Sequence, residues 1–190
     1  TDSSLFDQDR DPWELGGFAT FAGATFALDP QLPPTAVITG PSQVNEGQVA
    51  SFSGANSTDP DGDTLTYSWS FGDGATASGQ DVTHVYKENG TYTITLTVTD
   101  IHEATGSTIL TVTVNNLPAV VNAAQNQTGL EGSVVSLVSA PFVDPGILDT
   151  HSSTIDWGDG ARPQGTVTET GGNGAVQGSH IYGDNRVYTV

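Results

Sequence analysis

The chain has 190 residues, with 22 Asp and Glu against 4 Lys and Arg, giving a formal net charge of −18. Such a surface repels nucleic acids and anionic membranes and attracts cations, which argues against a nucleic-acid-binding protein. The absence of Cys excludes disulfides and thiolate metal sites, and no apolar run reaches the roughly 18 residues of a membrane span.

Residues 1–33 begin with an acidic stretch that contains Asp7, Asp9 and Asp11. An EF-hand loop starting at Asp7 would need Gly and Glu at its sixth and twelfth positions, where this chain has Pro12 and Phe18. The stretch is therefore interpreted as a solvated acidic segment. Because the chain begins at Thr1 rather than Met, we expect it to be processed or a piece of a longer protein.

Residues 18–28 are apolar and typical of at least one β-strand that needs a partner, since an isolated strand or hairpin is marginal in water. Its large side chains are Phe18, Phe21 and Phe26. Residues 29–34 follow as a proline-stiffened linker, and residues 115–118 have a similar composition before the second half of the chain.

The most informative strand is residues 65–71, where Leu65, Tyr67, Trp69 and Phe71 alternate with Thr and Ser. This period of two predicts a strand with one buried face, ended by the Gly72-Asp73-Gly74 turn. Residues 155–160 repeat the pattern as Ile-Asp-Trp-Gly-Asp-Gly. The chain therefore contains an internal repeat.

The first repeat predicts an all-β unit with alternating inward and outward side chains. Its strands are expected near residues 35–39, 48–54, 64–71, 80–86, 90–99 and 106–114. Along 90–99, Tyr92, Ile94, Leu96 and Val98 should face inward while the threonines face outward; Leu110, Val112 and Val114 should do the same on the last strand.

The second repeat should form strands near residues 134–138, 153–157, 165–170 and 174–181. It stops at Val190, inside what should be its penultimate strand. We therefore expect an open, apolar sheet edge in this unit.

Three motifs together resemble the PKD (polycystic kidney disease) domain, an immunoglobulin-like β-sandwich. They are Trp69-Ser-Phe-Gly-Asp-Gly74, His84-Val-Tyr86 and Gly90-Thr-Tyr92, and a looser copy holds Trp157-Gly-Asp-Gly160, His180-Ile-Tyr182 and Tyr188. The resemblance implies tandem antiparallel β-sandwiches: an N-terminal segment over 1–33, a complete domain over 34–116, and a domain over 117–190 that is incomplete at its C-terminus.

Carboxylates in two loops of the first unit form a candidate metal site. Asp59, Asp61 and Asp63 lie between its second and third strands, and Asp100 and Glu103 lie between its last two. In an immunoglobulin topology these loops share one pole, and hard oxygen ligands suit Ca²⁺. Some members of the resembled family bind calcium there, which implies Asp59, Asp61, Asp63 and Asp100 as ligands. The corresponding loop of the second unit keeps Asp144 and Asp149 but lacks the middle carboxylate, so calcium is expected less there than in the first unit. The alternative is a turn whose Asp side chains accept local backbone N–H groups.

The sequence holds no recognisable catalytic motif: no nucleophile elbow, phosphate loop, dinucleotide fingerprint or zinc-protease helix. His84 and His180 occupy equivalent repeat positions, which favours a packing role. His102 and His151 are single loop histidines without a spacing partner. The chain is therefore interpreted as non-catalytic.

The resulting hypothesis is an extracellular, cell-surface module that spaces, stiffens or adheres, as a fragment of a repetitive surface, filament or adhesin protein. Its partners would be protein, through self-association or neighbouring repeats. The alternative is an accessory module of a secreted hydrolase that binds carbohydrate or protein, as resembled domains do in some collagenases and chitinases. Inward-facing aromatics favour the first hypothesis.

The two ends of the chain leave a further alternative open. Either the missing strands lie beyond Val190 and residues 1–33 end a preceding domain, or residues 18–28 of one subunit fill the open edge of the next. In the second case the three phenylalanines act as plugs, Gly16-Gly17 is the flexible lead-in, and the polymer grows head to tail.

Overall fold

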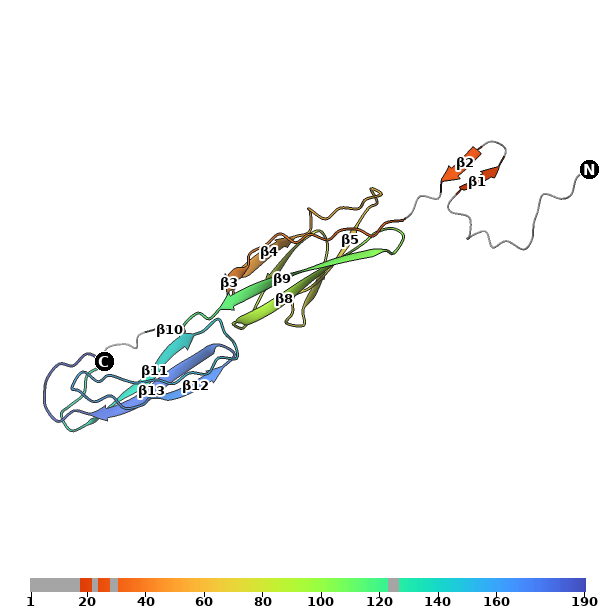
Figure 1. The fold of residues 1–190 in the computed structure, drawn as a ribbon. Helices are drawn as coiled ribbons and strands as arrows, with labels where there is room; N and C mark the ends of the chain where they lie inside the picture. The colour runs from red at the N-terminus through yellow and green to blue at the C-terminus, as the bar shows by residue number, and fades with distance from the viewer. Residues whose placement is uncertain (1–17, 22–23, 28–30, 123–126) are drawn as a thin grey trace, which may run out of the picture.

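A computed structural model describes residues 18–21, 24–27, 31–122 and 127–190 of the chain. These residues form thirteen strands and no helix, so the predicted all-β fold class is confirmed. Along the described ranges no helix could cross a membrane. Figure 1 shows a small hairpin, a first β-unit and a second β-unit following one another.

The apolar stretch at 18–28 forms a hairpin rather than a single strand. Strand β1 (Phe18–Phe21) pairs antiparallel with β2 (Ala24–Ala27), so each strand of this stretch has a partner within it. The acidic segment at residues 1–17, including the proposed Gly16-Gly17 lead-in, lies outside the described residues. So do residues 28–30 of the first linker and the side chains of the three phenylalanines.

The first unit packs a five-stranded sheet of order β3-β9-β8-β5-β6 against a two-stranded sheet of β4 and β7. Their bounds are β3 (Gln43–Asn45), β4 (Val49–Ser53), β5 (Thr66–Ser70), β6 (Thr76–Ser78), β7 (Asp81–Val85), β8 (Gly90–Thr99) and β9 (Thr105–Asn115). The strand expected at 35–39 is reduced to single bridges, Thr35 to Thr58 and Thr39 to Ser53. Prolines 33, 34 and 41 flank it and lack the N–H groups that a continuous ladder needs.

The core of the first unit lies where β5 meets β8. Trp69 is opposite Leu96 and fully buried, and its indole N–H donates to the Gly79 carbonyl at 2.8 Å. Ile94, Leu96, Val98 and Val112 are also fully buried, while Tyr67, Tyr92 and Leu110 pack against them half-buried. The predicted inward register of these strands is confirmed.

The second unit holds one four-stranded sheet of order β10-β11-β13-β12. The strands are β10 (Val120–Val121), β11 (Val134–Val143), β12 (Thr166–Thr170) and β13 (Asn173–Ile181). The predicted strand at 153–157 makes only one bridge, Thr154 to Gln164, and residues 188–190 form no strand. Its core is Ala140, Phe142, Ile155, Trp157 and Val176.

A glycine turn ends the Trp-bearing segment in both repeats. Gly72 has a φ of 85°, and a Cβ there would lie 2.8 Å from the Thr93 carbonyl oxygen. Gly158 has a φ of 80° and approaches the Thr189 carbonyl in the same way. Both positions need glycine for two reasons, the left-handed backbone and the close approach of a neighbouring chain segment.

The histidines of both repeats are packing residues, as predicted. His84 stacks on Phe71 with ring centroids 4.1 Å apart, and its Nε2 lies 2.7 Å from Asp73 Oδ2. His180 stacks on Trp157 at 5.3 Å and lies 2.6 Å from Asp159 Oδ2.

The tyrosine two residues after each histidine completes the repeated motif. Tyr86 donates its O–H to the Phe71 carbonyl, and Tyr182 donates its O–H to the Trp157 carbonyl, both at 3.0 Å. Burial, with the charge of Asp73 as a smaller cause, raises the pKa of Tyr86 to about 12. The same set of contacts in both units supports the internal repeat.

We expect Trp69→Ala to lower the free energy of unfolding of the first unit by about 3–5 kcal/mol, because a large buried aromatic leaves a cavity. Urea denaturation followed by circular dichroism measures this loss. Thr111→Ala on the outer face of β9 is the control, with an expected change within about 0.5 kcal/mol. A loss no larger than that of the control would contradict the assigned core.

Asp73 predicts a loss of stability in acid. Burial favours its protonated form, but hydrogen bonds from the Ala75 N–H and His84 outweigh burial and hold its pKa below the ordinary value of 3.8. A lowered pKa stabilises the fold above the unfolded value, and this contribution disappears as the pH falls through the folded value.

Asp73→Asn should therefore lower the melting temperature at neutral pH, and the gap to the wild type should close as the pH falls below 3.8. Melting curves across that range test this. Asp81→Asn, which removes an exposed charge from β7, controls for the change in net charge. A gap independent of pH would contradict the role given to the ionised carboxylate.

Candidate metal centre at the junction of the two units

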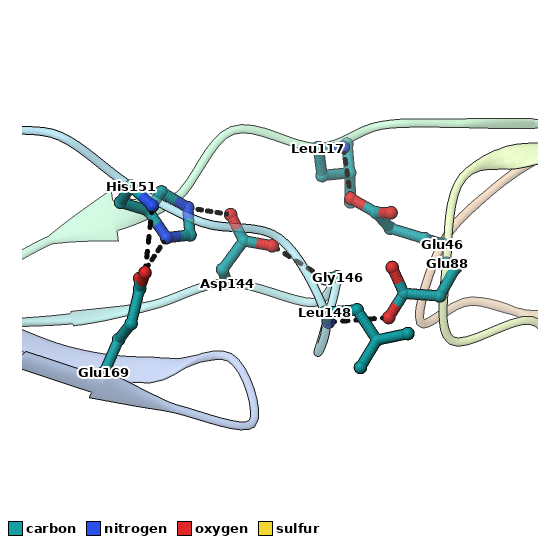
Figure 2. A network of polar contacts seen from close by, with 8 residues as sticks. All are labelled: Glu46, Glu88, Leu117, Asp144, Gly146, Leu148, His151 and Glu169. Atoms are coloured by element: carbon teal, nitrogen blue, oxygen red, sulfur yellow. Dashed lines mark hydrogen bonds and ion pairs between the residues drawn. The ribbon is translucent and has the colours of Figure 1, made fainter.

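The loop 144–149, which follows β11, docks on the first unit. The Ile147 N–H donates to the Lys87 carbonyl at 3.3 Å, and the Leu148 N–H donates to Oε1 of Glu88 at 2.7 Å. Figure 2 shows this loop beside the turn that carries Glu88. Two backbone N–H groups of the second unit are thus satisfied by the first unit, which gives the junction a defined geometry.

Glu46 belongs to the first unit, and its side chain contacts the connection to the second unit. It follows β3 directly and is only 1% exposed. Its Oε1 accepts the Leu117 N–H at 2.7 Å, which ties down the connection between the two units. Its Oε2 is buried and has no hydrogen-bond partner. A buried carboxylate oxygen without a partner is costly, so this oxygen marks a position where a positive group would stabilise the fold.

Asp144, at the start of the loop, is 4% exposed, and its carboxylate accepts a hydrogen bond from the backbone of the same loop. Its Oδ1 accepts the Gly146 N–H at 2.7 Å, and its Oδ2 lies 3.0 Å from Nε2 of His151. On its other side, His151 Nδ1 lies 2.6 Å from Oε2 of Glu169. The hydrogen bond to Glu169 outweighs burial and, together with that to Asp144, raises the pKa of His151.

Three carboxylates converge at this place. Oxygens of Glu46, Asp144 and Asp149 all lie within 4.8 Å of one another. A Cβ on Gly146 would stand 2.6 Å from Asp149 Oδ2 and 3.0 Å from Glu46 Oε2, so the glycine leaves the space into which both oxygens point. At an effective dielectric constant of about 20, two ionised carboxylates at this distance repel by roughly 3–4 kcal/mol.

The four aspartates predicted as calcium ligands lie at the other pole of the first unit. Asp59 Oδ1 accepts the N–H groups of Asp61 and Asp63, and Asp61 Oδ2 accepts the Leu32 N–H of the linker at 2.7 Å. Asp100 Oδ1 accepts the N–H groups of two residues in its own loop, His102 and Ala104. These contacts fit the alternative of local turns.

Two oxygens of this pole are nevertheless unsatisfied. Asp59 Oδ2 and Asp100 Oδ2 are buried without a hydrogen-bond partner, while Asp63 Oδ2 lies 3.0 Å from His102 Nδ1. Among the described residues, the carboxylates gathered in a set of three within 4.8 Å are those of the junction and not these four. Carboxylate oxygens, including the two without a partner, are ligands that suit Ca²⁺, but these four aspartates are not gathered within that distance of one another.

Sequence reasoning missed Glu46, His102 and His151 as parts of these sites. Both histidines have carboxylate partners, which lie 39 residues away for His102 and 7 and 18 away for His151. The sequence offered one signal for Glu46. It lies two residues after the inward-facing Val44, so the period of two of this short strand places its charged side chain on the same inward side. The residues with which it clusters lie about a hundred positions further along the chain.

Comparison with known proteins connects the chain to one domain family. Residues 31–114 match the family model described as the PKD domain. A microbial collagenase of Vibrio alginolyticus is 40% identical over 84 residues, which are 44% of this chain and 10% of that protein. The collagenase ColQ1 of Bacillus cereus is 30% identical over 146 residues, 65% of this chain and 15% of that protein.

Among solved structures, the PKD1 domain of the Vibrio cholerae metalloprotease PrtV is similar at 29% identity, with a TM-score of 0.39. The match covers 44% of this chain and 99% of that one. The chain spans about a tenth to a seventh of the length of the two collagenases it matches. On the family match and the β-sandwich built around Trp69, residues 31–114 belong to the PKD domain family.

Proposed function

We propose that this chain is a non-catalytic extracellular module that acts as a spacer or protein-protein assembly unit within a surface or filament protein. The observation that carries the proposal is the docked loop 144–149, whose backbone N–H groups donate to the Lys87 carbonyl and the Glu88 carboxylate and so join the two units. A joint held by such hydrogen bonds keeps a fixed angle better than a free linker does, and a fixed angle is what a spacer requires.

The second candidate is an accessory module of a secreted hydrolase that binds carbohydrate or protein. It is favoured by the collagenases among the relatives, since this chain matches only 10% and 15% of their lengths. Collagen is an extracellular protein, which also supports an extracellular location. A carbohydrate-binding face is expected to present exposed aromatic side chains. None of the Phe, Tyr and Trp side chains in residues 31–122 and 127–190 is exposed, which argues against such a face.

Self-association by strand donation is the other partner hypothesis. The second unit carries exposed apolar side chains on β11 and β13, Val134, Val138 and Ile181. The donor stretch, however, pairs with itself as β1 and β2, so donation would require this hairpin to open or to add as a hairpin. Deletion of residues 1–30 tests it: unchanged assembly in analytical ultracentrifugation removes strand donation, and dissociation of polymers into monomers supports it.

Calcium at the outer pole of the first unit is a separate part of the proposal. Asp59, Asp61, Asp63 and Asp100 would bind Ca²⁺ there, supported by the buried and unpaired oxygens of Asp59 and Asp100. An ion would neutralise clustered carboxylates beside Leu32 of the linker and stiffen the entry of the chain.

We expect chelation to lower the melting temperature of the chain, because an ion that binds only the folded state stabilises it by mass action. Asp61→Asn and Asp63→Asn should reduce this calcium dependence. Asp156→Asn, an exposed carboxylate elsewhere, is the control. The absence of heat at about millimolar Ca²⁺ in calorimetry would remove this pole as a calcium site.

The spacer role predicts a narrow distribution of distances between the two units. Because the chain has no Cys, Thr111→Cys on β9 and Thr168→Cys on β12 provide two unique labelling sites on exposed positions. Single-molecule energy transfer should give one narrow peak. Glu88→Ala, which removes the acceptor of the Leu148 N–H, should broaden the peak, whereas Glu131→Ala should not.

A broad peak in the parent protein would contradict the spacer role. Cosedimentation with insoluble collagen and insoluble polysaccharides, with albumin as the control protein, then tests the accessory-module alternative. Saturable binding to one of these would favour that alternative.

A further inference from the structure

We propose that Glu46, Asp144 and Asp149 bind a calcium ion that links the first unit to the second. This site is distinct from the pole of Asp59, Asp61, Asp63 and Asp100, and it does not rest on the spacer function. Its ligands come from both units, Glu46 from the turn after β3 and the two aspartates from loop 144–149. Figure 2 shows Glu46 and Asp144 on either side of the loop at Gly146.

The geometry suits a common ion. Ca²⁺ binds oxygens at about 2.3–2.6 Å, so ligands of one ion lie at most about 5 Å apart. The three carboxylates offer oxygens within 4.8 Å of one another, which meets this limit. Carboxylate ligands with a flexible arrangement favour Ca²⁺ over Mg²⁺, which demands near-ideal octahedral geometry and retains several waters.

The burial of Glu46 is the independent observation that points to a ligand. Its side chain is 99% buried, and its Oε2 lies toward the space above Gly146 without any hydrogen-bond partner. Its other oxygen is already fixed by the Leu117 N–H, so the carboxylate cannot turn to satisfy both. A cation in this space would be the partner of Oε2 and would screen it from Asp144 and Asp149.

The surrounding contacts hold the ligands in place before an ion arrives. The Gly146 N–H and His151 fix both oxygens of Asp144, and the Leu148 bond to Glu88 fixes the loop against the first unit. A carboxylate oxygen with one hydrogen bond keeps lone pairs that can coordinate a metal. Preorganised ligands lose little conformational entropy on binding, which favours affinity.

Calorimetric titration of the full chain with CaCl₂ after chelation tests the proposal. Asp149→Asn removes a half-buried ligand and should weaken calcium binding at the junction at least about tenfold, as should Glu46→Gln. Gly146→Ala leaves all charges unchanged but places a methyl group between the two oxygens, and should weaken binding likewise. Asp156→Asn, an exposed charge in the second unit, should leave the affinity unchanged.

Asp61→Asn separates the two poles, because it should leave the binding event at the junction in place. Calcium binding lost in Asp61→Asn but retained in Asp149→Asn and Gly146→Ala would place the ion at the outer pole and overturn the proposal. Equal affinity in the parent chain and all three junction variants would overturn it too, as would no binding heat in the parent chain. If Glu46→Gln does not fold, the other two variants decide.

The labelled pair at Thr111 and Thr168 gives a readout of the link itself. Calcium should narrow the distance distribution between the units in the parent chain and have no such effect in Asp149→Asn. A narrow peak without calcium together with no calcium binding would retain the spacer function and exclude the junction site. The two proposals can therefore fail separately.

Discussion

The packing of β5 against β8 is the constraint on which the first unit depends. Trp69 and Leu96 are opposite each other and completely buried, and the indole N–H is satisfied by the Gly79 carbonyl. Once this pair is fixed, the period of two assigns every other side chain of both strands to a face, since a slip of one residue would expose the whole set. Threonines then line the outer face, which gives a wettable surface without charge.

The junction shows the opposite chemistry, since it buries charge instead of apolar surface. Glu46 and Asp144 are nearly inaccessible, and Asp149 is half-buried beside them. Hydrogen bonds from Leu117, Gly146 and His151 satisfy three of the four oxygens of Glu46 and Asp144. The repulsion among these carboxylates is the electrostatic feature on which the proposed calcium link rests, whereas the two cores consist of apolar side chains.

The repeated aromatic cluster explains how a smaller second unit keeps the same local design. In both repeats a histidine stacks on the aromatic residue before the turn and lies within hydrogen-bonding distance of the turn aspartate. The tyrosine two residues after it donates to the carbonyl of that same aromatic residue. The hydrogen bond of the Ala161 N–H, with that of His180, lowers the pKa of Asp159. The equivalent hydrogen bonds of the first repeat, from the Ala75 N–H and His84, lower the pKa of Asp73 against the effect of burial. These contacts are local, so they do not require a complete opposing sheet.

The sequence by itself determined the all-β class, the internal repeat, the buried register of β5, β8 and β9, and the packing role of His84 and His180. Each of these follows from local period or turn chemistry, in which the residues that interact are the ones that define the pattern. It failed at residues 35–39, 153–157 and 188–190, where neighbouring prolines or missing ladder partners leave only bridges or irregular backbone.

Only the tertiary structure decided the junction. Glu46 and Asp149 are separated by more than a hundred residues, and they meet because one loop of the second unit docks on a turn of the first. The pairing of His151 with Glu169 depends likewise on how β12 lies beside the loop. Periodicity reports the face on which a side chain lies but not which distant loop covers it, so a site built from loops of two units has no local signature.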